Sequence, residues 1–180
     1  MLKRIVKEIK GALENELYIS ALSLALIIPD ICGKVKYPDL RTGERYVKWY
    51  NEFVSKNFLS GDEIPEFYDE SLPKVDGNLI YKLRCSMLHE GDPNVTKDKD
   101  CDVDFFKLVT ERDNPCHIYA GNCLEVSQDS DGKMTRTVSI SIRSFCAVMT
   151  TIAMNFYNDN KSGFHFNYKV IDLEQYYEQM

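Results

Sequence analysis

The sequence predicts a single, mainly helical domain with a small antiparallel β insert between its fourth and fifth helices. Three observations lead to this fold class. Apolar residues recur at helical spacing before residue 91 and again from 142 to 158, a strand-like and turn-rich segment fills 103–140, and 180 residues suffice for one packed core. With 44% hydrophobic and 28% charged residues, the composition is that of a soluble globular protein.

The first predicted helix covers residues 2–14. Its apolar face consists of Leu2, Ile5, Ile9 and Leu13. The other side is charged and includes a basic face, which we interpret as solvated: Lys3, Arg4, Lys7 and Lys10. Asn15 and Glu16 indicate a tight break before the next helix.

A second helix is expected over residues 17–28, which are apolar almost all round, as in a helix at the centre of a bundle. Pro29 and Gly33 are expected to end or bend it, and residues 34–43 to form a loop. The third helix should run from an N-cap at Thr42 to about Phe58.

The fourth helix is expected to open at Asp76 or Asn78 after a long loop over 60–77. One stripe of it is apolar: Leu79, Ile80, Leu83 and Met87. Gly91 and Pro93 are typical of a helix end, so the helix should stop there.

The insert should hold strands at 105–110, 116–126 and 134–140, with a hairpin turn at Asp131-Gly132. A fifth helix follows, capped by Ser139 or Ser141. Its apolar residues are Ile142, Phe145, Met149, Ile152 and Phe156. A short strand at 163–171 and a last helix from Asp172 to Met180 complete the prediction.

Charge and hydropathy narrow the function classes. A net charge of −6 argues against a generally basic surface for duplex DNA but leaves room for a local basic groove that binds RNA. The start of the chain shows no signal-peptide pattern, and the apolar run 17–28 is too short to span a bilayer. We therefore expect a cytoplasmic protein that does not bind membranes.

The six cysteines form no CxxC pair and are expected to be reduced. The four residues whose types suit zinc have spacings that match no zinc module: Cys101, Cys116, His117 and Cys123. The sequence thus predicts no metal site and no cofactor.

The segment that points to chemistry is Leu83–Gly91, LRCSMLHEG, in which four residues separate Arg84 from His89. Cations near a helix C-terminus also suit the helix dipole, so the spacing has a purely structural interpretation as well. An α-helix would place the two residues about 140° apart, and we expect the last turn to bring His89 towards Arg84. Arg binds phosphate through two hydrogen bonds, and His transfers protons near neutral pH.

This segment, on the fourth helix of a bundle, resembles the Arg-x4-6-His signature of HEPN domains. The stretches ALSLALIIPDICGKVKYP and RTGERYVKWYNEF are also similar to HEPN-type bundles of bacterial proteins, some of them linked to plasmids or phage defence. The resemblance covers about residues 2–91 and the helix 142–158, but not the β insert.

The resemblance implies a homodimer in which two copies of the motif meet at a cleft. It also implies metal-independent cleavage of single-stranded RNA, to a 2′,3′-cyclic phosphate and a 5′-hydroxyl. Arg84 would stabilise the phosphate charge and His89 would transfer the proton.

Cys85 departs from the family pattern, where a polar residue often follows the Arg, and a thiol would orient the site less well. This favours a non-catalytic HEPN module that binds a nucleotide, an RNA or a protein partner. A third alternative is an interaction protein that docks through an apolar patch on 103–140.

Overall fold

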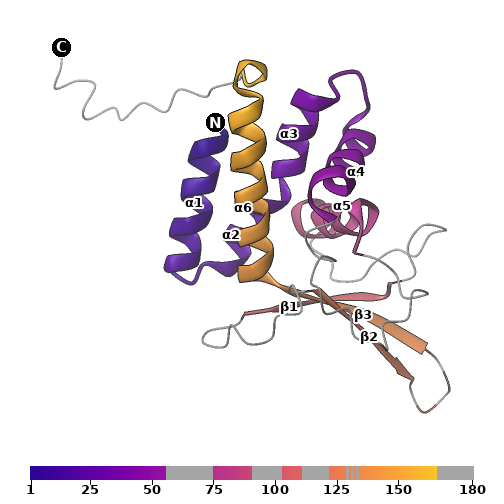
Figure 1. Cartoon of the computed structure of the whole chain (residues 1–180). Helices are drawn as coiled ribbons and strands as arrows, with labels where there is room; N and C mark the ends of the chain where they lie inside the picture. Colours follow the sequence, from indigo (N-terminus) through magenta and orange to yellow (C-terminus); the bar gives the residue numbers. More distant parts are fainter. Residues whose placement is uncertain are drawn as a thin grey trace, which may run out of the picture.

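The computed structural model describes residues 1–55, 75–90, 103–110, 122–128, 130, 132 and 134–165. Helices form an upright bundle, and the strands lie across one end of it (Figure 1). The predicted class, a mainly helical domain with a small β insert, is confirmed.

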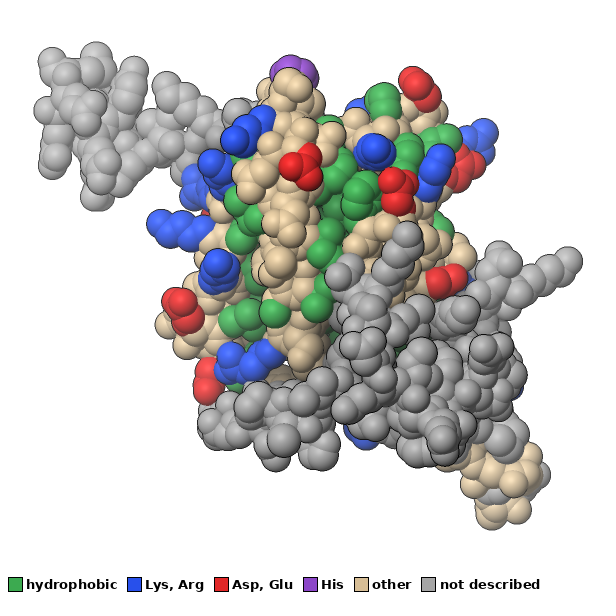
Figure 2. All heavy atoms as spheres, in the orientation of Figure 1, with side chains coloured by type: hydrophobic (Ala, Val, Ile, Leu, Met, Phe, Trp, Pro, Cys, Tyr) green, Lys and Arg blue, Asp and Glu red, His purple; other side chains and the backbone are tan. Residues whose placement is uncertain are grey.

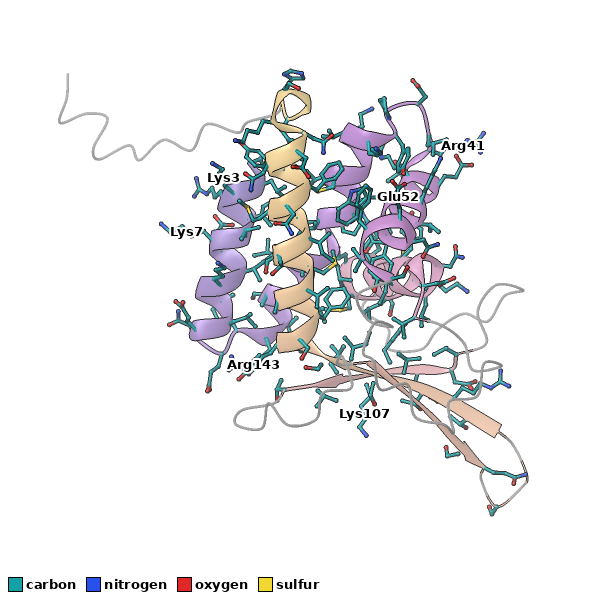
Figure 3. All side chains as sticks on the ribbon, viewed as in Figure 1. Lys3, Lys7, Arg41, Glu52, Lys107 and Arg143 are labelled. Atoms are coloured by element: carbon teal, nitrogen blue, oxygen red, sulfur yellow. The ribbon has the colours of Figure 1, made fainter. Side chains whose placement is uncertain are left out.

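Helix α1 (Leu2–Glu14) packs beside α2 (Tyr18–Leu26) and the long α6 (Ile142–Asp159). Of its predicted apolar face, Leu2, Ile5 and Ile9 are buried and Leu13 is partly buried. Glu16 makes the break with a left-handed φ of 57°. The basic face is exposed, and Lys3 and Lys7 project outward from α1 (Figure 3). At the foot of α6, Arg143 donates from Nη2 to the Tyr18 hydroxyl at 2.9 Å, which ties α6 to α2.

The prediction that the second helix ends or bends at Pro29 is confirmed, since α2 ends at Leu26, whereas Gly33 lies inside the next helix. This new helix, α3 (Ile28–Lys36), begins beside Pro29, because proline is tolerated in a first turn where its missing N–H has no intrahelical partner. The expected loop 34–43 is therefore confined to the residues between Lys36 and Thr42. Together α2 and α3 form a stretch, Tyr18–Lys36, that is long and apolar enough to cross a membrane, and 50% of it is buried in the bundle.

Helix α4 (Thr42–Phe53) begins one residue after its N-cap, which is Arg41 rather than Thr42. It ends before the expected Phe58, which lies outside the described residues. Helix α5 (Gly77–Cys85) starts where predicted, since the Asp76 carboxylate accepts a hydrogen bond from the Leu79 amide at 3.0 Å.

The described strands are β1 (Phe105–Val109), β2 (Asn122–Gln128) and β3 (Met134–Ser141), in the order β1-β3-β2. The pair β2–β3 is antiparallel, as expected, and Gly132 in its turn has a φ of 80°. However, β1 pairs with β3 in parallel, so the sheet is mixed. Alternation of polar and apolar residues marks a strand but carries no information on its direction.

Strand β3 leads directly into α6, whose N-cap is Ser141, one of the two predicted caps. The strand expected at 163–171 is not seen at its start, where residues Lys161–Gly163 form a short 3-10 helix. The remainder of that strand and the helix expected from Asp172 to Met180 lie outside the described residues.

Large aromatic side chains fill the core where α4 meets α6. Trp49 is fully buried, and the rings of Phe53 and Phe156 lie 5.5 and 5.7 Å from it. Figure 2 shows apolar side chains reaching the surface in a band between α6 and the α3–α4 pair. This packing fixes α3, α4 and α5 relative to one another, and those three helices carry the candidate site.

Candidate active site where helices α3 and α5 meet

The predicted pair Arg84 and His89 is held at the end of α5. The helix is anchored by its buried Leu79, Ile80 and Leu83. It passes very close to α4, because a Cβ placed on Gly77 would lie 2.6 Å from the carbonyl oxygen of Val47. Arg84 lies in the last turn of this rigid element.

The turn that follows is a π-helix, Ser86–Glu90. An α-helix would place Arg84 and His89 about 140° apart, but a π-helix, with i→i+5 hydrogen bonds, has more residues per turn, so residues five apart lie closer to one face. The Nη1 atom of Arg84 is 2.9 Å from Nε2 of His89. The sequence therefore identified two residues that do come together, although a π-helical turn, not a frayed one, unites them.

A third residue, Asp30 of α3, completes the cluster. Its Oδ2 atom accepts a hydrogen bond from Arg84 Nε at 2.9 Å, and the two side chains are only 17% and 16% exposed. Asp30 thus holds the inner edge of the guanidinium while the Nη1 end reaches His89. Sequence reasoning treated Asp30 only as the end of an apolar run, yet a lone carboxylate in such a run was the signal that it serves a polar cluster.

Burial and charge oppose each other at this ion pair. Burial raises the pKa of the Asp30 carboxyl above its ordinary value, and the adjacent Arg84 guanidinium lowers it without fully compensating. For Arg84, burial lowers the pKa but attraction to Asp30 outweighs this, so its pKa is raised. The guanidinium remains charged, and the carboxylate is the member whose charge is least stable.

Tyr81 forms one wall of the cluster. Its ring lies 5.7 Å from the Arg84 guanidinium and 5.1 Å from the ring of Tyr46, which is fully buried and donates to the Leu26 carbonyl. Cys85 is a free thiol, half-buried, and lies close enough to Tyr81 and Arg84 to raise the pKa of both.

The contact with Arg84 selects one tautomer of His89. A guanidinium has only donors, so a hydrogen bond between the two groups requires Nε2 to accept, in the imidazole tautomer whose proton is on Nδ1. His89 is exposed to solvent. The cluster therefore presents a basic lone pair, at present occupied by Arg84, at the protein surface.

Other candidate ligands lie elsewhere. Within the described ranges, no group of three or more His, Cys, Asp or Glu side chains is placed to hold a metal ion. His165 is exposed at the far end of α6. The residues Cys101, Cys116 and His117 lie outside the described part of the chain.

Comparison of the chain with protein-family models, curated proteins and solved structures finds no match in any of the three.

Proposed function

We propose that this protein is a HEPN-type, metal-independent endoribonuclease that cleaves single-stranded RNA as a homodimer and serves as a toxin or phage-defence effector. The observation that carries the proposal is the 2.9 Å contact between Arg84 Nη1 and His89 Nε2 at an exposed π-helical turn. The contact joins a permanently charged guanidinium, which can bind a phosphate, to a neutral imidazole, which can take up a proton. Attack by a 2′-hydroxyl requires both groups.

The reaction follows from these two groups. A phosphodiester that binds Arg84 competes for Nη1 and frees the lone pair of His89 Nε2. His89 then takes the proton of the ribose 2′-hydroxyl, the 2′-oxygen attacks phosphorus, and the bond to the 5′-oxygen breaks. The leaving oxygen takes a proton from a second group, for which the imidazolium form of His89 of the other protomer, released from its own Arg84, is the proposed donor. A 2′,3′-cyclic phosphate and a 5′-hydroxyl result.

Cleavage of a labelled single-stranded RNA in EDTA tests this function. His89→Ala should reduce the rate by a factor of roughly 10² to 10⁴, the usual contribution of a general base. His165→Ala is the matched control, because it removes an exposed imidazole at the far end of α6. Equal cleavage by wild type and His89→Ala, or no cleavage by either, contradicts the proposal.

The dimer is tested separately by light scattering coupled to gel filtration, where we expect twice the mass of the 20.8 kDa chain. A monomer that still cleaves RNA would show that one copy of Arg84 and His89 is enough and would remove the second histidine from the mechanism.

One observation favours a second function, a non-catalytic module that binds RNA or another phosphate ligand. Arg84 is engaged by Asp30 through a largely buried ion pair, the arrangement expected of a residue with a structural role. RNA binding by wild type without any cleavage would support this alternative. The third candidate, docking through the insert, has less support: among the side chains described there, only Phe105 is a large exposed hydrophobic.

A further inference from the structure

A second arginine, Arg45 of α4, approaches the same cluster from another helix. Helices α3 and α4 touch at Gly33, where an added Cβ would lie 2.8 Å from the Arg45 carbonyl oxygen and 3.4 Å from Arg45 Cγ. Gly33 follows Asp30 by three residues and therefore shares its face of α3. The absence of a side chain at Gly33 lets the stem of Arg45 run alongside the helix that carries Asp30.

The first turn of α4 also reaches the wall of the site. A Cβ on Gly43 would meet the Tyr81 ring at 3.4 Å, and the same ring also contacts the Arg84 guanidinium. Helix α4 therefore contacts α3 at Gly33 and α5 at Tyr81. These two contacts place Arg45 of α4 near the cluster that contains Arg84.

The charges of this cluster do not balance. The ionisable groups around Asp30 are Arg84, Arg45 and His89, together with the neutral side chains of Tyr46, Tyr81 and Cys85. Among these described groups, two guanidiniums, which do not lose their protons, act on a single carboxylate. Within this set one positive charge is left over before His89 takes up any proton.

Arg45 is also incompletely bonded. Its Nη2 atom donates to Thr42 Oγ1 over a long 3.3 Å, while its Nε is buried and has no hydrogen-bond partner among the described residues. A buried Nε–H without a hydrogen-bond partner is costly, and an anion bound at this guanidinium would lower that cost. Arg84, in turn, gives only Nε to Asp30 and shares Nη1 with a neutral imidazole that it can release.

We propose that Arg45 and Arg84 form a two-guanidinium subsite for a phosphate of single-stranded RNA, with Asp30 as the carboxylate that holds Arg84 in position. The choice of RNA as the ligand rests on the proposed function, but the subsite itself requires no cleavage. Two planar forks from different helices suit a tetrahedral phosphate, which offers several acceptor oxygens in different directions.

Binding of a 2′-O-methylated single-stranded RNA, which no 2′-hydroxyl mechanism can cleave, tests the subsite at several salt concentrations. Arg45→Gln should weaken binding about tenfold and lower the slope of log K against log salt by about 0.7, the loss of one phosphate contact. Arg4→Gln is the matched control, because it removes an exposed guanidinium from α1, on the side of the bundle away from α5 (Figure 1). It should leave affinity and slope unchanged.

A second variant, Arg45→Lys, keeps the test valid if Arg45→Gln fails to fold. It keeps the charge but loses the planar fork, so we expect a two- to fivefold loss of affinity, on the order of a weakened charged hydrogen bond, with the slope retained. The subsite is wrong if wild type does not bind this RNA, or if both Arg45 variants bind as wild type does. Arg45-dependent binding by a protein that cleaves nothing would keep the subsite and reject the nuclease, whereas cleavage that is insensitive to Arg45→Gln would do the reverse.

Discussion

Arg84 donates a hydrogen bond from Nη1 to Nε2 of His89 across 2.9 Å, although the two residues are five positions apart. An unbroken α-helix could not bring them together, since residues five apart point in different directions. The π-helical turn Ser86–Glu90 removes this offset. Such turns are rare and concentrate at functional sites, so the local backbone and the candidate chemistry point to the same five residues.

The first prediction tests whether the π-helical turn is required. In the double variant Leu88→His/His89→Leu, the histidine follows Arg84 by four residues, the spacing that would be cofacial in an α-helix. The exchange moves the imidazole by about a quarter of a turn around the helix axis, away from the place where Nε2 meets Nη1 of Arg84. RNA cleavage should therefore be no faster than in His89→Ala. The test compares the cleavage rates of the double variant, His89→Ala and wild type at one RNA concentration. A double variant as active as wild type would show that the π-helical turn is dispensable.

The second prediction concerns the stability of the ion pair between Asp30 and Arg84. Arg84→Gln leaves a largely buried carboxylate without its partner, and we expect the free energy of unfolding to fall by about 2 kcal/mol. Adding Asp30→Asn should restore most of that loss, because the uncompensated charge is then gone. Urea denaturation of wild type, Arg84→Gln, Asp30→Asn and the double variant measures the coupling free energy between the two side chains. If the losses of the single variants add up in the double variant, the pair is energetically independent.

The third prediction concerns the direction in which the stability of the protein changes with pH because of Asp30. Burial raises the pKa of Asp30 in the folded protein above its value in the unfolded chain, so between these two values the folded state binds more protons. Stability should therefore increase as pH falls from neutral through the raised pKa, relative to Asp30→Asn, which cannot titrate there. Unfolding free energies of both proteins between pH 7 and 4 test this, and a wild type that loses stability relative to Asp30→Asn on acidification would show that Arg84 outweighs burial.

The order and extent of several helices could be read from residue spacing. The stripe of α1, the Asp76 cap of α5 and the Ser141 cap of α6 each leave a local signal in the sequence, and the structure places all three as predicted. What failed were features that depend on distant partners. Pro29 signals a helix boundary but not whether a new helix follows, and the parallel pairing of β1 with β3 depends on how the chain crosses over.

The candidate site was predictable only in part, for the same reason. Arg84 and His89 share one helix, so their spacing could suggest the pair. Asp30 is 54 residues from Arg84 in the chain, and the tertiary fold joins them, because α3 and α5 both pack against α4. The π-helical turn was not foreseen, because the segment Ser86–Glu90 differs in no obvious way from an ordinary α-helical end.

The last prediction tests the close contact of α3 with α4 that places Arg45. In Gly33→Ala the new Cβ would lie 2.8 Å from the Arg45 carbonyl oxygen, a backbone atom that can move only if the helices separate. We expect the free energy of unfolding to fall by about 1–3 kcal/mol, as in overpacked cores. Gly11→Ala on α1 is the control: nothing lies within 4 Å of its Cβ, so the better helix propensity of alanine should stabilise the protein by about 0.5–1 kcal/mol. Thermal unfolding of the two variants should therefore shift in opposite directions, and a stabilised Gly33→Ala would show that the helices do not approach as closely as described.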